Sequence, residues 1–245
     1  GIGVAITGDI QGKIMTEVQP MKMASAEALY NTESPASFSW FTLGTPDGSS
    51  EKFAIKTPHL LSFLATGSWN GKVEGINQLR ERYQQTYGKD PGAKYYSPGD
   101  YTPVIPLTYW TFRWMIGLGL AGAGLAAWIL WATRRGRVPV GRKTLTAAIA
   151  LPFLPLLANS AGWIFTEAGR QPWAVFGLMT TDHAVSPGVS ALDMWISLIA
   201  LTSVYGVLAF VEVRLMLTWI RKGAEQLPTD VPTDAGGDRP LAFAY

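Results

Sequence analysis

The residues of this chain with the clearest chemical potential are a carboxylate and a guanidinium at the end of a long apolar segment. Glu167 and Arg170 lie three positions apart, which is about one turn of a helix. Ionisable side chains at membrane depth are costly, so they are candidates for a functional site. Trp163 precedes Glu167 by four positions, so on a helix its indole would line the same cavity as the carboxylate. The alternative is a Glu167–Arg170 ion pair in interfacial water, which would contribute little energy.

Arg113 and Met115 form a second candidate site inside another long apolar segment. A guanidinium at this depth needs an anionic partner, or it must extend along the helix until it reaches water. The thioether of Met115 is a soft metal ligand, whereas most membrane methionines fill gaps between helices. The residue types alone leave both interpretations open.

Gln19, Lys22 and Glu27 form a third group of polar side chains, before the first long apolar segment. Lys22 and Glu27 are five positions apart, so they would point about 140° away from each other on an ideal helix. They would not pair directly there. Either they bind a ligand from two sides, or they are a solvated lysine and glutamate.

Three long apolar runs must position these side chains. Residues 105–133, 144–167 and 191–220 each contain close to or more than the about 20 residues that cross a bilayer. Residues 1–7 are apolar but too short to span, without a starting Met or a signal-peptide pattern, and we interpret them as the end of a further transmembrane helix. The sequence therefore predicts an all-α integral membrane protein, a transmembrane helix bundle with an extracellular loop region.

The positions of the basic residues predict how the chain is oriented. Residues 134–143 include four arginines and one lysine, and no acidic residue. Such loops stay on the cytoplasmic side. Residues 8–104 and 168–190 are then outside, and residues 221–245 form a cytoplasmic tail whose composition predicts disorder.

Local signals predict further elements. Helices are expected over residues 20–30, with Pro20 in the first turn, and over residues 73–87, where apolar residues recur at three- and four-residue spacing. Glycine, proline and aspartate predict turns and loops in residues 44–50 and 91–106. Pro152 and Pro155 predict a bend in the second span. Ser190 and Asp193 predict a capping box at the start of the third.

Composition excludes several classes of function. The formal net charge is only +2, with mixed signs in the outer region, so there is no electrostatic footprint for nucleic acid. The chain has no cysteine and therefore no disulfide and no thiolate metal site. His59 and His183 fall in the outer loops, where we interpret them as ordinary surface or packed histidines.

Three stretches of the sequence resemble subunit I of the cytochrome bd-type quinol oxidases. Glu167 opens a block that resembles the family's Glu-x-Gly-Arg-Gln-Pro-Trp signature, and Phe112 opens one that resembles its Phe-Arg-x-Met element. Residues 8–28 resemble the start of the family's external quinol-binding loop. The short external loop and the Phe-Ala-Tyr end look like actinobacterial members.

The resemblance implies roles for the three candidate groups. Gln19, Lys22 and Glu27 match quinol-site residues, Met115 an axial ligand of the low-spin haem b, and Glu167 a ligand of the high-spin haem b. Arg113, Trp163 and Arg170 would belong to the haem surroundings, Arg113 with a haem propionate as its partner. The whole enzyme would oxidise quinol outside, pass electrons through haems b to haem d, and reduce oxygen to water with cytoplasmic protons.

The resemblance also implies what else such an enzyme needs. It covers the end of the family's sixth helix through its ninth, so the two histidine haem ligands belong to earlier helices that this chain does not contain. Expected partners are those N-terminal helices, a second oxidase subunit, menaquinol or ubiquinol, oxygen and the lipid of a bacterial cell membrane. Two other classes remain: a cofactor-free membrane subunit or assembly partner, and a transporter whose Arg113 and Glu167 line a substrate path.

Overall fold

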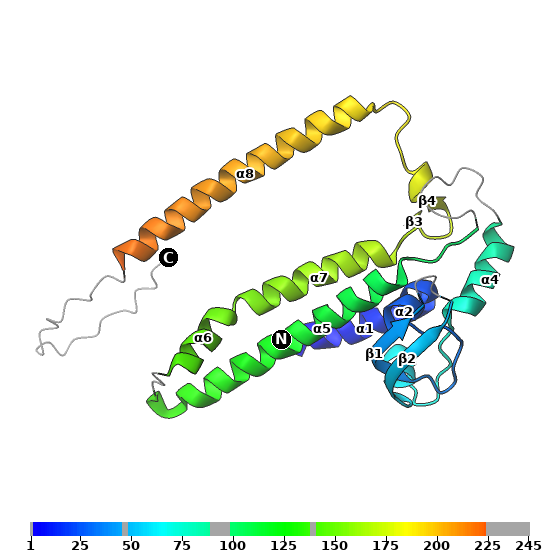
Figure 1. Cartoon of the computed structure of the whole chain (residues 1–245), viewed down its shortest axis with the longest axis horizontal. Helices are drawn as coiled ribbons and strands as arrows, with labels where there is room; N and C mark the ends of the chain where they lie inside the picture. Colours follow the sequence, from blue (N-terminus) through cyan, green and yellow to red (C-terminus); the bar gives the residue numbers. More distant parts are fainter. Residues whose placement is uncertain (1, 46–48, 89–98, 138–140, 224–245) are drawn as a thin grey trace, which may run out of the picture. The chain divides into compact units, whose positions relative to one another are not determined.

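The computed structural model describes residues 2–45, 49–88, 99–137 and 141–223 (Figure 1). Contacts divide the chain into two units, residues 1–185 and residues 186–245. The first unit holds a pair of long helices and a smaller region, formed by the described residues between 2 and 104, which we call the outer region after its predicted location. The second is dominated by one long helix, α8 (Ala191–Lys222). The predicted tail covers residues 221–245, but Arg221 and Lys222 belong to α8. Residues 224–245 of this tail, and residues 46–48 and 91–98 of the predicted loops, lie outside the described residues.

Three helical segments of the described chain are long and apolar enough to cross a membrane: residues 105–136, 142–169 and 191–222. This confirms the predicted helical membrane class. The first is α5 (Ile105–Thr133) with the short 3₁₀ turn η1 (Arg134–Gly136). The second divides into α6 (Arg142–Ala150) and α7 (Phe153–Gly169), so the break falls at Pro152, as predicted. The third starts with the predicted capping box, in which Ser190 and Asp193 exchange hydrogen bonds.

The helices α5 and α7 run side by side because small residues let them approach closely (Figure 1). A Cβ atom built on Gly122 would lie 3.5 Å from Leu154 Cβ, and one on Gly162 would lie 3.0 Å from the sulfur of Met115. Ala158 is buried in the same interface. In lipid the hydrophobic effect does not drive helices together. Close van der Waals packing, which small residues permit, holds such crossings instead.

The outer region begins with α1 (Ile2–Val18), which continues without a break past residue 8. The next helix, α2 (Pro20–Glu27), starts at the predicted proline. It ends three residues earlier than predicted because Ala28 adopts a left-handed conformation with φ of 48°. Six of its eight residues are buried, so α2 is a core element of the outer region rather than a surface helix.

A β-hairpin follows, which the sequence analysis did not predict. Strand β1 (Phe38–Gly44) pairs antiparallel with β2 (Glu51–Thr57). The helices α3 (Leu60–Thr66) and α4 (Ile76–Tyr87) come next. The predicted helix over residues 73–87 starts three residues late, because Val73 pairs with Glu33 in a β-bridge and Gly75 packs against the backbone of Asn31.

An aromatic cluster joins the outer region to the segment after α7. That segment contains β3 (Trp173–Val175), β4 (Met179–Thr180) and the 3₁₀ turn η2 (Thr181–His183). Trp173 stacks on Tyr101 with a centroid distance of 4.9 Å, and both contact Tyr87 of α4 edge to face. Tyr83 and Phe176 extend the cluster. The cluster therefore fixes the end of α7 against the outer region.

Candidate quinol and haem sites

Glu27 and Arg113 form a buried ion pair that joins α2 to α5. Arg113 Nη2 lies 2.6 Å from Glu27 Oε2, and the side chains are only 11% and 3% exposed. Arg113 Nε also donates a hydrogen bond of 2.8 Å to the carbonyl oxygen of Ser39. Burial raises the pKa of the Glu27 carboxyl above its ordinary 4.5, while Arg113 acts to lower it.

Aromatic rings enclose the guanidinium of Arg113. Its central carbon lies 4.6 Å from the ring centroids of Phe38 and Tyr109 and 5.4 Å from that of Phe112. Such rings attract a cation through their negative faces. The anionic partner that the sequence analysis required is therefore Glu27 in this chain, and the guanidinium does not extend into water. The predicted contact of Arg113 with a haem propionate stays a prediction.

Lys22 leaves α2 on a different side and reaches α7. Its Nζ donates a hydrogen bond of 3.3 Å to the carbonyl oxygen of Thr166 and lies 5.2 Å from the ring centroid of Phe165. Its stem passes Gly169, where a Cβ atom would lie 3.2 Å from Lys22 Cγ. Burial lowers the pKa of Lys22, and the negative charge of Glu167 acts to raise it. As their spacing predicted, Lys22 and Glu27 do not pair; they contact two different helices.

Gln19 and Lys22 line a recess between α2 and the segment after α7. The recess has a volume of about 50 Å³, and its other lining residues include Arg170, Gln171 and Trp173. This space holds about one or two water molecules, so only the oxygen-bearing edge of a ring would enter it without movement of the walls. Glu27 does not line the recess. The structure therefore brings Gln19 and Lys22 together and separates Glu27 from them.

Glu167 and Arg170 lie at the C-terminal end of α7. Arg170 Nη2 is 2.7 Å from Glu167 Oε2, and the two side chains are 42% and 51% exposed, respectively. Trp163, one turn before Glu167, is 63% exposed. In this chain the pair is thus exposed, as expected for the alternative in which Glu167 and Arg170 form an ion pair in interfacial water. The carboxylate and the indole nevertheless share an open helix face, on which a further group could pack.

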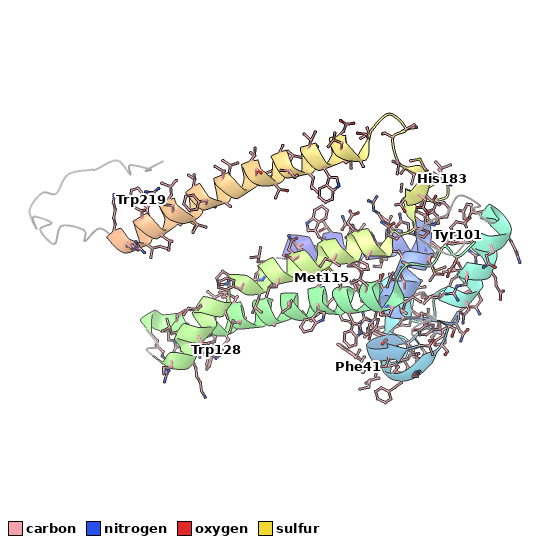
Figure 2. All side chains as sticks on the ribbon, turned by 45° about the horizontal axis from the view of Figure 1, so that its top comes forward. Phe41, Tyr101, Met115, Trp128, His183 and Trp219 are labelled. Carbon is pink, nitrogen blue, oxygen red and sulfur yellow. The ribbon has the colours of Figure 1, made fainter. Side chains whose placement is uncertain are left out.

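Met115 lies where α5 and α7 run side by side (Figure 2), and its sulfur is close to Gly162. The side chain is only partly buried, so part of it remains accessible. A thioether is an axial ligand that haem iron accepts, and a carboxylate on the adjacent helix is an oxygen donor that binds iron in other sites. Among the described residues, no group of three or more His, Asp or Glu side chains could hold a metal ion. His59 bonds the carbonyl oxygen of Trp69 through Nδ1, and His183 ends the 3₁₀ turn η2 in the segment after α7. Their location outside the membrane stays a prediction.

Sequence reasoning missed the residues that hold Arg113 in place. Tyr109 precedes it by one helical turn, so their shared face on α5 was a usable signal. Ser39 gave no such signal, because it acts through its backbone carbonyl from 74 positions away. The carbonyl of Thr166 is equally invisible in the sequence.

Comparison with known proteins decides the family. Residues 1–224 match the profile described as cytochrome bd terminal oxidase subunit I. The chain belongs to this family. It is 42% identical to the cytochrome bd ubiquinol oxidase subunit 1 of Bacillus subtilis (strain 168), over 92% of this chain and 46% of that protein. It is 28% identical to the cytochrome bd-II ubiquinol oxidase subunit 1 of Escherichia coli (strain K12), over 96% of this chain and 55% of that protein.

A solved structure supports the same assignment. The bd oxidase from Geobacillus thermodenitrificans matches with a TM-score of 0.68 and 25% identity, over 91% of this chain and 46% of that chain. The chain thus spans about half the length of the relatives that it matches. The resemblance stated from the sequence is confirmed, whereas the predicted roles of single residues stay predictions.

The raised pKa of Glu27 predicts how the outer region responds to pH when Arg113 is removed. A raised carboxyl pKa contributes stability below about pH 4.5 that is lost as pH rises through the folded-state pKa. Arg113→Gln removes the charge that holds this pKa down, so the loss becomes larger. We expect the thermal unfolding midpoint of the complete oxidase to fall more at pH 8 than at pH 5, with a cost of about 3–5 kcal/mol at the higher pH.

The control is Arg82→Gln, which breaks the more exposed pair with Glu74. It should cost about 1 kcal/mol or less at both pH values. Adding Glu27→Gln to Arg113→Gln should abolish the pH dependence. If Arg113→Gln lowered the unfolding midpoint equally at pH 5 and pH 8, the result would contradict a buried Glu27–Arg113 pair.

Proposed function

We propose that this chain is part of the main subunit of a terminal respiratory quinol oxidase, which oxidises quinol at the outer membrane face and reduces oxygen to water. Membership of the family supports the reaction class. The observation that carries the assignment in this chain is the position of Lys22, which lines a recess and also contacts the end of α7 beside Glu167. A recess with polar side chains at the end of the Glu167 helix suits a donor of electrons and protons.

The quinol head group would bind at the outer end of this recess. Gln19 and Lys22 offer hydrogen-bond donors to a ring oxygen, and the lowered pKa of Lys22 reflects the partly dry surroundings in which such a bond is strong. Quinol oxidation releases two protons, so an acceptor is needed at the membrane boundary. Glu27 is the carboxylate predicted for this role. Its raised pKa suits proton acceptance, but a proton could reach it only if the Arg113 pair opened.

Met115 and Glu167 would each supply one side-chain ligand to a haem. Met115 would hold the low-spin haem b and Glu167 the high-spin haem b, with Arg113, Trp163 and Arg170 around them. When bound, these groups and haem d supply one-electron transfer and oxygen reduction. Arg170 already holds the Glu167 carboxylate in one orientation, and Gly162 leaves room for the Met115 side chain between α5 and α7.

The remaining parts of such an enzyme would come from outside this chain. The histidine haem ligands would come from the N-terminal helices of the same subunit, and a second oxidase subunit would complete the assembly. In a bacterial cell membrane, residues 8–104 would face outward and the C-terminus would face the cytoplasm. Menaquinol is the quinol that the resemblance to actinobacterial members favours, and ubiquinol is the alternative.

Removing the Lys22 ammonium should weaken quinol binding more than it affects haem chemistry. Lys22→Ala removes a charge-assisted hydrogen bond, whose loss of about 1.5 kcal/mol corresponds to an about tenfold higher KM for quinol. Oxidation of an artificial donor that bypasses the recess should stay nearly unchanged. The control is Lys13→Ala, because Lys13 bonds Asp9 on α1 instead. Equal losses with both donors would remove Lys22 from the quinol site.

Two substitutions should separate the two haems b. Met115→Leu keeps volume and apolarity but removes the sulfur lone pairs, so packing should survive while the low-spin haem b is lost or changes its midpoint potential. Glu167→Ala should change only the high-spin haem b. Reduced-minus-oxidised spectra and redox titration of each variant measure both effects. A low-spin signal and midpoint that Met115→Leu leaves unchanged would exclude Met115 as a ligand.

A further inference from the structure

The β-hairpin has its polarity reversed relative to a sheet on the surface of a water-soluble protein. Cross-strand pairs Phe41–Ile55 and Leu43–Phe53 lie on the same face, because they are two positions apart along each strand. All four side chains are exposed, Phe53 and Ile55 by more than half. Four adjacent apolar side chains in water make an exposed patch that calls for a partner surface.

The opposite face of the hairpin is polar and faces inward. Thr42 is buried there and bonds the hydroxyl of Ser39, which in turn bonds the hydroxyl of Tyr109 on α5. Hydrogen bonds thus hold this face to α5, while the four apolar side chains of the other face stay between 36% and 54% exposed. The arrangement stabilises the hairpin only if something other than water covers the apolar face.

Contacts with α5 give the depth of the hairpin. The carbonyl of Ser39 accepts a hydrogen bond from Arg113, and the ring of Phe41 lies 5.3 Å from that of Trp110. Arg113 is eight residues into α5, about 12 Å along its axis. The 29 residues of α5 measure about 43 Å, compared with about 30 Å for the hydrocarbon core, so the outer turns lie in the head-group region. The hairpin is therefore beside the part of α5 that crosses the membrane interface.

The residues around the apolar face have the composition of that interface. Trp40 at the bulge of β1 and Trp114 on α5 are both more than half exposed, and Trp110, one turn before Trp114, contacts Phe41. Tryptophan is enriched where head groups meet acyl chains, because its ring is apolar and its N–H is polar. Exposed apolar and aromatic side chains therefore occur both on the hairpin and on the turns of α5 that it contacts.

We propose that the outer face of the hairpin, formed by Phe41, Leu43, Phe53 and Ile55, is inserted into the outer leaflet of the bilayer and anchors the external segment to lipid. The occupant of this face is the boundary between head groups and acyl chains. Lipid covers the four apolar side chains, which explains why the polar face is turned inward. Since Ser39 in the same strand bonds Arg113, the anchor also holds the strand that supports the buried ion pair.

A nitroxide label tests this placement in the complete oxidase in lipid nanodiscs. This chain has no cysteine, so Phe53→Cys gives it a single attachment site, in an oxidase whose other cysteines are replaced. Apolar oxygen concentrates in lipid and a nickel chelate stays in water. We expect the ratio of oxygen to nickel collisions at position 53 to be several-fold higher than at Glu81→Cys on the exposed side of α4. Ile55→Cys provides a second position on the same face.

Two results would overturn the proposal. A collision ratio at positions 53 and 55 equal to that at position 81 would mean that the face is in water. An immobilised label that neither reagent reaches would mean that another part of the oxidase covers the face. Retention of the haem spectrum shows for each labelled protein that the fold is intact, so a loss of the spectrum at one position leaves the other to decide.

Discussion

The ion pair between Glu27 and Arg113 is the interaction on which the arrangement of the outer region depends. Both charges are almost completely removed from water, so neither can lose the other without leaving a buried charge unpaired. Three aromatic rings and the Ser39 carbonyl complete the surroundings of the guanidinium. A pair of this kind adds little net stability compared with apolar packing, but it fixes one geometry, because a slip of α2 along α5 would break it.

The second contact of α2 makes it a bridge. Lys22 meets the end of α7 while Glu27 meets α5, and the five-residue spacing directs them to different sides. The helix α2 therefore contacts both α5 and α7, which also pack directly on each other. The recess beside Lys22 opens at the same junction. Gly169 and Arg170 line this recess, so a ligand bound there would lie beside the C-terminal end of α7.

The sequence predicted the features that neighbouring residues determine better than those that depend on contacts between distant residues. The three long apolar helices, the break at Pro152, the start of α2 at Pro20 and the Ser190 capping box follow from length, proline geometry and short spacing, and the structure confirms all of them. The β-hairpin was not predicted. Its large apolar side chains lie two positions apart along each strand, but they are exposed, so the pattern does not mark a face packed on a core.

The partner of Arg113 could not be found from the sequence either. Glu27 lies 86 positions away from Arg113, and the sequence analysis had already interpreted Glu27 as a quinol-site residue. The buried guanidinium predicted that an anionic partner exists, but only the folded structure identifies that partner as Glu27. The recess could not be predicted for the same reason. Gln19 and Gln171 line it together because of tertiary packing, and no sequence motif links them.

Hydrogen exchange in the complete oxidase tests most directly whether this ion pair holds α2 in place. The account predicts that Arg113→Gln speeds exchange of the buried amides of α2 and of β1 near Ser39, whereas Arg82→Gln, at the more exposed pair on α4, does not. Unchanged protection of α2 in Arg113→Gln, in an enzyme that keeps its haem spectrum, would contradict the claim that the Glu27–Arg113 pair organises the outer region.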